Sequence, residues 1–436
     1  MQKSVDSARA NLIKYSIRTL AVVADKLKEL GVNVWAWENI GDPIKQGHQV
    51  PEWIKEILKK ICDDNANWGY SPTEGLLETR TFIAESRKKQ DIPLHEKDIV
   101  FTSGLGHAIG MLYEAMLGTG VRTICPSPTY PSHSSMESFI TGKEPILYAC
   151  RAENNWQPDT TDLEEKIKNN PDIGFILLIL PNNPTGACYS DEILLDIARL
   201  AKKHHLAIIS DETYINLIFK KHSQTSMAEI LRRVGGFPLI VMRSMSKDIP
   251  WPGGRSGWME FYNYDDDGNF LELEETLKQM LRTQVCSTTM LQAALPKIYG
   301  DARYPAHLAN FIPLIEEQSE YISAELNKLD VINCVPGQGA FYLAAVFKEG
   351  VLKPNQTLAI ANPEAKIYIE KLVSDPKMPL DKRFSLYLMA AKGIFVTPLS
   401  GFEGPLGFRV TTLRTDLEET KKVYDVITEA IKEYVK

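Results

Sequence analysis

The sequence lacks any pair of cysteines at the Cys-x-x-Cys spacing that zinc sites and redox motifs use. Six cysteines are scattered along the chain: Cys62, Cys125, Cys150, Cys188, Cys286 and Cys334. Without a regular spacing, neither a zinc site nor a disulfide framework is expected, and a reducing compartment fits this cysteine usage. We therefore predict no metal site.

Long apolar runs and a surplus of positive charge are missing as well. The longest apolar run, residues 174–180, is far too short to span a bilayer. Residues 1–10 are polar and charged, without the apolar segment of a secretion signal. The 49 lysines and arginines are outnumbered by 56 aspartates and glutamates, so the net charge is -7. Nothing electrostatic favours nucleic acid or an anionic membrane as a partner, and we expect a cytoplasmic protein.

The chain does have the length and composition of an ordinary globular protein. Its 436 residues, 44% hydrophobic and 24% charged, suffice for a large core and two domains. From residue 99 onward, apolar strands alternate with helices, and the strands are expected at 99–102, 122–125, 174–180, 206–210, 239–242 and 257–262. This alternation predicts an α/β protein in which helices cover a mostly parallel sheet.

A smaller α+β domain is expected in the last part of the chain. A helix over about 310–329 is long enough to bridge two domains, and strand-like stretches follow at 331–334, 339–346 and 409–413. We predict a large domain of residues 48–330 and a small domain of residues 331–436, against which the N-terminal segment 1–47 packs. The stretch 354–382 is either a lid or an insertion.

Polar residues gather where the predicted strands end, which is where ligands bind in open α/β sheets. The segment Ser244-Met245-Ser246-Lys247 follows an apolar run, and Arg255 comes shortly after it. A buried ammonium must be paired, neutralised or covalently engaged, and an arginine suits a phosphate. The combination points to a lysine that holds pyridoxal 5'-phosphate (PLP) as a Schiff base. A lysine in a solvated loop is the plainer alternative.

Two further strand-end segments are candidates for contacts with such a cofactor. Ser103-Gly104-Leu105-Gly106 leaves backbone N–H groups free at a helix N-terminus, which is a natural phosphate site. A plain tight turn is the alternative for this segment. Prolines flank Tyr130 and would hold its ring rigidly as a stacking face, although a tyrosine at a domain surface is the commoner case.

Asn183, Asp211 and Tyr214 complete the predicted ring contacts. Asn183 precedes a proline, so its backbone is extended and its amide suits a phenolate oxygen; an Asn-Pro turn is the alternative. Asp211 follows the buried run 206–210 and needs a cationic partner there, such as a protonated pyridine nitrogen. A helix N-cap is the alternative for Asp211. Tyr214, three residues on, is placed to aim its hydroxyl at the same ring.

In order and spacing, these segments resemble the PLP-dependent aminotransferases of fold type I, the class I and II group related to aspartate aminotransferase. That family carries an asparagine in Pro-x-Asn-Pro-Thr-Gly, an aspartate in Ser-Asp-Glu-x-Tyr, a lysine in Ser-x-Ser-Lys and an arginine in Gly-x-Arg-x-Gly. The matching residues of this sequence are Asn183, Asp211 with Tyr214, Lys247 and Arg255. The resemblance extends from Gly41 to Arg409 and implies the three-layer fold of that family.

The resemblance also implies a role for each of these residues. Lys247 forms the Schiff base and later moves the substrate proton, and Asp211 pairs with the pyridine nitrogen. Asn183 and Tyr214 bond the 3' oxygen, while Tyr130 stacks on the ring. The phosphate site is formed by Ser103, Gly104, Leu105, Gly106, Ser244, Ser246 and Arg255.

Residues outside this cluster resemble the family's partner and substrate contacts. Tyr70 resembles the tyrosine that reaches the phosphate of the neighbouring subunit, which implies a homodimer with shared active sites. Thr288 or Thr289 is a further candidate at that interface. Arg409 resembles the arginine that binds the α-carboxylate, with Gly41 and Asn183 beside it. A surface salt bridge is the alternative for Arg409, and Arg414 is its nearby rival.

We predict an enzyme that moves an amino group from an L-amino acid to a 2-oxo acid. A PLP lyase or decarboxylase is the alternative, because the sequence does not show which Cα bond is held perpendicular to the ring. A non-catalytic PLP-binding regulator would carry a DNA-binding segment, and none is recognised. The side-chain pocket stays open: Arg282 is a candidate for a second carboxylate, and an apolar pocket has four candidate tryptophans, Trp35, Trp37, Trp68 and Trp251.

Overall fold

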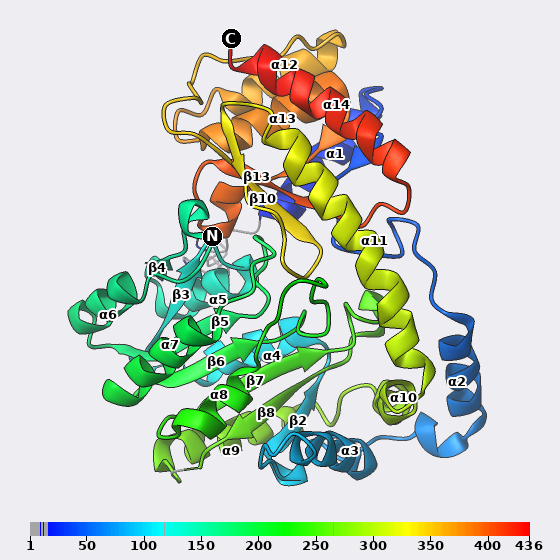
Figure 1. Cartoon of the computed structure of the whole chain (residues 1–436), viewed down its shortest axis with the longest axis vertical. Coiled ribbons are helices and arrows are strands. Elements are labelled where there is room, and N and C mark those ends of the chain that lie inside the picture. Colours follow the sequence, from blue (N-terminus) through cyan, green and yellow to red (C-terminus); the bar gives the residue numbers. More distant parts are fainter. Residues whose placement is uncertain (1–8, 10–11, 13–15, 117, 265) are drawn as a thin grey trace, which may run out of the picture.

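The structure is a computed structural model that describes residues 9, 12, 16–116, 118–264 and 266–436 (Figure 1). The strands are β1 Ala36–Trp37, β2 Ile99–Thr102, β3 Arg122–Ser127, β4 Ile146–Ala149, β5 Ile173–Ile179, β6 Ala207–Asp211, β7 Leu239–Ser244, β8 Gly257–Tyr262, β9 Ile332–Cys334, β10 Tyr342–Phe347, β11 Ile394–Phe395, β12 Thr397–Pro398 and β13 Gly407–Thr411. The α-helices are α1 Ser16–Glu29, α2 Glu52–Asp63, α3 Leu77–Lys88, α4 Leu105–Ala115, α5 Pro131–Thr141, α6 Thr160–Asn169, α7 Asp191–Lys203, α8 Met227–Val234, α9 Gly268–Thr283, α10 Thr289–Tyr299, α11 Arg303–Leu326, α12 Pro363–Val373, α13 Leu380–Lys392 and α14 Leu417–Tyr434.

The central sheet has the strand order β2-β8-β7-β6-β5-β3-β4. The pairs from β7 through β6, β5 and β3 to β4 are parallel. Only β8 runs against its two neighbours in this sheet of the described chain, β7 and β2. The prediction of an α/β protein with a mostly parallel sheet is therefore confirmed. The carboxyl ends of β5, β6 and β7 lie side by side, which places the polar segments that follow them at one edge.

Alternating side chains of the central strands fill two separate cores. In β5, Ile176 and Leu178 point into one core with α3, α7, α8 and α10. The neighbouring residues Leu177 and Ile179 point into the other core, with α4 and α9. A strand buried on both faces reads as an unbroken apolar run because every residue meets a helix layer. This arrangement of helices, sheet and helices gives the predicted three layers.

A third core lies around the sheet β12-β13-β10-β9 and the two-stranded sheet β1-β11. It includes Leu20 and Leu27 of α1 together with side chains of α12, α13 and α14. Helix α11 joins the two regions: it begins beside α10 and ends in this core with Ile322 and Leu326 (Figure 1). The division into a large domain of 48–330 and a small domain of 1–47 with 331–436 stays a prediction.

Three expectations from the sequence need adjustment. Helix α11 begins at Arg303 rather than near 310, because Pro305 lies in its first turn, where proline is tolerated. Strand β10 begins at Tyr342 rather than at 339, since Ala340 adopts a positive φ of 57° that interrupts an extended chain. The stretch 354–382 contains α12 and contributes buried Leu358 and Ile369 to the third core, so it packs as part of that core.

Among the residues that the structure describes, no helix has both the length and the apolar character needed to cross a bilayer.

Candidate active site

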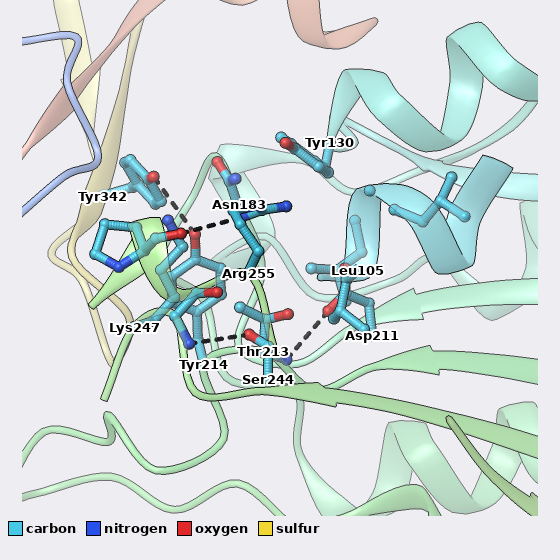
Figure 2. Close-up of a pocket in the computed structure, with 15 residues that line it drawn as sticks. Leu105, Tyr130, Asn183, Asp211, Thr213, Tyr214, Ser244, Lys247, Arg255 and Tyr342 are labelled. Atoms are coloured by element: carbon cyan, nitrogen blue, oxygen red, sulfur yellow. Dashed lines mark hydrogen bonds between the residues drawn. The ribbon is translucent and has the colours of Figure 1, made fainter. Parts of the chain in front are cut away.

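A cavity opens at the carboxyl edge of the central sheet, between the strand ends, the start of α4 and strand β10 (Figure 2). It is lined by Leu105, Gly106, Ile109, Tyr130, Ile179, Asn183, Asp211, Thr213, Tyr214, Ser244, Ser246, Lys247, Pro252, Arg255 and Tyr342. Most of the residues predicted to touch a cofactor are therefore neighbours in space. The predicted residues Gly41, Tyr70, Ser103, Gly104 and Arg409 are not among the lining residues.

Lys247 reaches the cavity from a tight turn after β7. In this turn the backbone N–H of Ser246 donates to Ser244 Oγ at 3.3 Å. Lys247 Nζ donates to the carbonyl oxygen of Gly41 at 3.1 Å and lies 5.7 Å from the ring centroid of Phe341. Within the described residues Lys247 forms no ion pair with a carboxylate, and its only hydrogen bond is to this carbonyl oxygen.

Asp211 ends β6 and is only 5% exposed. Its Oδ1 accepts a hydrogen bond from the N–H of Thr213 at 3.1 Å, and its Oδ2 lies 3.4 Å from Nε2 of His133. In the described part of the chain no lysine or arginine pairs with this carboxylate. A buried carboxylate without a full cationic partner is costly, which suits a site that receives a cation from a ligand.

Sequence reasoning missed His133. This residue is fully buried in the first turn of α5, and its Nδ1 lies 3.5 Å from the hydroxyl oxygen of Tyr113. It stands between Tyr113 and Asp211 and so orients that carboxylate. The signal that was available is the spacing: His133 comes three residues after Tyr130 at the start of a helix, so the two share a face. Their rings lie 6.5 Å apart in an edge-on arrangement.

Asn183 and Tyr214 lie close to the same part of the cavity. Oδ1 of Asn183 accepts a hydrogen bond from Arg409 Nη1 at 3.2 Å, which leaves its amide NH2 as a donor. The hydroxyl of Tyr214 donates to the hydroxyl oxygen of Tyr342 at 3.4 Å (Figure 2). Burial, with a contribution from Tyr342, raises the pKa of Tyr214 well above its usual value, so Tyr214 remains a protonated donor.

The start of α4 and Arg255 form the other end of the cavity. Gly104 caps α4 with a positive φ of 79°, and a Cβ on it would lie 2.3 Å from Arg255 Nη2, so glycine is required there. Arg255 Nη1 donates to the carbonyl oxygen of Pro252 at 3.1 Å, and no described carboxylate pairs with this guanidinium. Free N–H groups at a helix N-terminus beside an arginine make an anion site.

Ser103 is exposed and lies outside this anion site's lining. Its backbone N–H donates to Nδ1 of His107 at 3.2 Å. Burial lowers the pKa of His107, so the imidazole is neutral near pH 7 and its remaining proton sits on Nε2. The neutral imidazole of His107 therefore covers the N-terminus of α4 on the side of Ser103.

Arg409 on β13 is 2% exposed and is held from several directions. Its Nη2 donates to the carbonyl oxygen of Asn39 at 2.7 Å, and its guanidinium carbon lies 4.3 Å from the ring centroid of Tyr342 and 4.7 Å from that of Phe402. Its Nε, although buried, has no hydrogen-bond partner among the described residues. An arginine that is rigid, buried and paired with no described carboxylate is suited to receive one from a substrate.

The rival Arg414 is committed elsewhere. Its Nε donates to Glu38 Oε1 at 2.6 Å, and its Nη1 lies 3.7 Å from Glu419 Oε2. Arg282 likewise pairs with Glu275 on α9 and stays half exposed. Neither arginine lines the cavity, and neither do the four candidate tryptophans.

Tyr342 was not singled out from the sequence, and it lines the cavity on the same side as Lys247 (Figure 2). Its hydroxyl packs against Gly41 so closely that a Cβ on that glycine would lie 1.8 Å from the Tyr342 oxygen. Strand alternation indicates that every second residue of β10 faces inward, but it does not say what that face meets.

The comparisons with known proteins agree with this geometry. The family model "Aminotransferase class I and II" matches residues 39–427. The chain belongs to this family. It is 40% identical over 438 residues to an uncharacterised aminotransferase of Methanocaldococcus jannaschii, with both chains covered completely. It is 28% identical over 342 residues to the glutamate-pyruvate aminotransferase of Escherichia coli, covering 77% of this chain and 81% of the relative.

Among solved structures, an alanine aminotransferase from Pyrococcus furiosus superimposes with a TM-score of 0.83 at 28% identity, covering 98% of this chain and 100% of that one. The chain is therefore a fold type I, PLP-dependent aminotransferase that acts on an amino acid and a 2-oxo acid. The alternative of a PLP lyase or decarboxylase is not favoured, since the family and the named relatives are aminotransferases.

The residues of the cavity fit PLP. Asp211 is buried without a full cationic partner and matches a protonated pyridine nitrogen, while the N-terminus of α4 with Arg255 matches a phosphate. Lys247 lines the same cavity, and no described carboxylate pairs with its amine.

Proposed function

We propose that this aminotransferase uses L-alanine and pyruvate as one of its two amino acid and 2-oxo acid pairs. The observation that carries the proposal is Tyr342, whose ring stands 4.3 Å from the guanidinium of Arg409 and whose hydroxyl packs on Gly41. The space beside the carboxylate-binding arginine is bounded by an aromatic ring, which leaves room for a methyl group better than for a long side chain. The names of the relatives from E. coli and P. furiosus support the same pair.

We assign the roles of the cavity residues as follows. PLP, when bound, supplies an electron-withdrawing ring that stabilises the negative charge formed when the substrate loses its Cα proton. Asp211 keeps the ring nitrogen protonated, oriented by His133. Lys247 Nζ is the base that takes the Cα proton and later returns one. Asn183, and Tyr214 once its hydroxyl turns from Tyr342, would be the hydrogen-bond donors to the ring oxygen.

The substrate is held by its carboxylate. Arg409 is fixed by Asn39 and Asn183, so its planar donors are aimed before the substrate arrives. The carbonyl oxygen of Gly41 accepts from Lys247 Nζ, which holds that amine beside the arginine until it is needed. These contacts support a substrate position in which the Cα of the amino acid lies between Arg409 and Lys247.

A screen of amino donors tests the substrate proposal. With 2-oxoglutarate as acceptor, kcat/KM is expected to be highest for L-alanine and to fall for leucine, phenylalanine and aspartate, by about 10-fold or more for each poorly fitting side chain. Tyr342→Ala is the matched variant: it removes the ring that bounds the pocket and should raise the ratio of norvaline to alanine turnover. A wild-type enzyme that prefers leucine or phenylalanine to alanine would overturn the proposal.

We further propose that the enzyme is a homodimer in which Tyr70 completes the partner's site. Tyr70 is 86% exposed and lies away from the cavity of its own chain. Its loop is nonetheless held firmly: Thr289 Oγ1 donates to the carbonyl oxygen of Gly69 at 2.8 Å, and Gln292 Nε2 donates to Ser71 Oγ at 3.2 Å. A rigid loop that presents a large exposed aromatic side chain supports a role at an interface.

Mixing two inactive variants tests the shared site. Tyr70→Ala and Lys247→Ala are unfolded together, mixed in equal amounts and refolded. If Tyr70 serves the partner, each mixed dimer has one site with neither defect, and about a quarter of wild-type activity is expected from random pairing. If Tyr70 serves its own chain, every site keeps a defect and no activity returns.

A further inference from the structure

Asp248 comes directly after the candidate Schiff-base lysine, yet it is absent from the lining of the cavity and is 1% exposed. Its carboxylate points to the opposite side of the chain from Lys247. Oδ2 accepts hydrogen bonds from the hydroxyl of Tyr304 at 2.6 Å and from Nδ2 of Asn216 at 2.7 Å. The hydroxyl of Tyr299 lies 3.1 Å from Oδ2 and 3.3 Å from Oδ1.

The backbone around Asp248 is tied as well. The N–H of Ile249 donates to Asp248 Oδ1 at 3.0 Å. Nε2 of His307 lies 2.9 Å from the carbonyl oxygen of Asp248, and because a carbonyl only accepts, that nitrogen carries the proton. Asp248 therefore holds its own loop through both its side chain and its main chain.

The donors to Asp248 come from separate parts of the fold. Asn216 follows β6, Tyr299 is the last residue of α10, and Tyr304 and His307 lie in the first two turns of α11. They also contact one another: Asn216 Nδ2 donates to the Tyr304 hydroxyl oxygen at 3.1 Å, and the two tyrosine rings stand edge to face with centroids 4.9 Å apart. The lysine loop is thus fastened to α10 and α11 at a single carboxylate.

No lysine or arginine pairs with Asp248 among the described residues, so its donors are neutral hydroxyl, amide and backbone groups. Removing the carboxylate would leave the N–H of buried Ile249 and the hydroxyls of the partly buried Tyr299 and Tyr304 without this acceptor, which costs more than the loss of one exposed contact. The hydrogen bonds to Asp248 therefore favour one arrangement of the main chain next to Lys247.

Few contacts of its own fix the position of the Lys247 side chain. Its one hydrogen bond in the described structure is donated to the Gly41 carbonyl oxygen, and the lone pair of the neutral amine is what takes a proton. Where the Nζ atom then lies depends on where the Lys247 backbone is held. Displacement of a reacting group by about 1 Å costs on the order of 100-fold in rate.

We propose that Asp248 is a positioning residue for Lys247: its buried carboxylate fastens the lysine loop to Tyr299 of α10 and to Tyr304 of α11. This inference rests on the proposed role of Lys247 as the base. Because α11 continues to Ile322 and Leu326 in the third core, the same contact links the position of Lys247 to the region that carries Arg409.

Three variants test the proposal in the full chain. Asp248→Ala removes the acceptor, Asp248→Asn keeps one acceptor oxygen, and Tyr304→Phe removes only the hydrogen bond at 2.6 Å. Asp381→Asn is the control. Asp381 is as buried as Asp248 and accepts hydrogen bonds from Ser400, but it lies on α13, which packs in the third core and does not line the cavity.

The first readout is hydrogen exchange in the protein without PLP, which does not depend on catalysis. Amides of residues 244–249 and of Trp251 should exchange at least about tenfold faster in Asp248→Ala than in wild type, with a smaller increase in Asp248→Asn. Tyr304→Phe should change in the same direction even if Asp248→Ala fails to fold. The Asp381→Asn control should leave these amides unchanged.

The second readout is kinetic and spectroscopic. In Asp248→Asn, kcat should fall by about 10- to 100-fold with KM nearly unchanged, and the pH midpoint of the visible spectrum of bound PLP should shift. The proposal would be overturned if Asp248→Asn and Tyr304→Phe lowered only Tm. In that case the amide exchange, the pH midpoint of the PLP spectrum and kcat would all equal those of wild type. If exchange changes but Lys247→Ala remains active, the positioning of the loop stands and the role of Lys247 fails.

Discussion

Replacing Lys247 with alanine is expected to abolish amino transfer, with kcat at least about 10,000-fold below wild type. Under the proposed assignment, the variant loses both the amine that binds PLP covalently and the base that moves the Cα proton. It should still fold, because the Lys247 side chain makes a single hydrogen bond, to the Gly41 carbonyl oxygen, and no ion pair within the described residues. The measurements are steady-state kinetics with a coupled pyruvate assay and Tm of the protein without PLP.

The covalent link gives a direct check on the same residue. Borohydride reduction of the wild-type holoenzyme should add the mass of reduced PLP to the peptide that contains Lys247, and the Lys247→Ala variant should gain none. Lys247→Arg keeps the positive charge but not a usable amine, so it should be equally inactive. Lys278→Ala is the matched control, since Lys278 is also largely buried but pairs with Glu274 on α9. Label found on another lysine would contradict the assignment.

The carboxyl-edge residues could be predicted from the sequence because each lies just after a buried strand. Lys247, Asp211 and Asn183 follow apolar runs that only a covered sheet explains, and parallel strands bring their carboxyl ends to one edge. The alternation in β5, with Ile176 and Leu177 in different cores, shows why those runs are continuous. A local pattern was sufficient for these positions.

Residues that act across the fold were beyond the reach of local patterns. Tyr342 meets Gly41 from some 300 positions away in the chain, and His133 reaches Asp211 from another strand–helix unit. Asp248 looks like any polar loop residue until α10 and α11 are placed against it. Neither the strand order nor the antiparallel course of β8 is encoded in a periodicity, since both depend on which strands pair.

The starts of β10 and α11 differ from the predicted starts, and each difference has a local cause that the apolar pattern does not show. Ala340 is apolar and sits in a strand-like stretch, but the carbonyl oxygen of Leu217 accepts its N–H and its φ is positive, so β10 starts two residues later. Helix α11 starts at Arg303 although Pro305 follows two residues later, because this proline lies in the first turn, where no helical N–H is needed.

Replacing Arg409 with alanine should lower kcat/KM for both substrates by about 100- to 10,000-fold, which corresponds to the loss of a buried charged partner. The effect should appear mainly in KM, because the carboxylate is held in the same way before and during proton transfer. Arg409→Lys should recover only part of the loss in kcat/KM. The lysine restores the positive charge, but its ammonium cannot form the two parallel hydrogen bonds of a guanidinium. Competition by a monocarboxylate inhibitor measures the binding part separately.

Arg414→Ala is the contrasting variant that makes this prediction decisive. Glu38 is 1% exposed and accepts hydrogen bonds from Arg414 and from the hydroxyl of Tyr424. Burial already raises the pKa of Glu38 and Arg414 opposes that rise, so removing Arg414 leaves a buried carboxyl without its cation. Arg414→Ala should therefore lower Tm while KM for alanine stays within about twofold, whereas Arg409→Ala should raise KM. If Arg414→Ala raised KM for alanine and Arg409→Ala did not, the substrate carboxylate would be assigned to Arg414 instead of Arg409. The amino acid would then have to approach Lys247 from the side of Arg414.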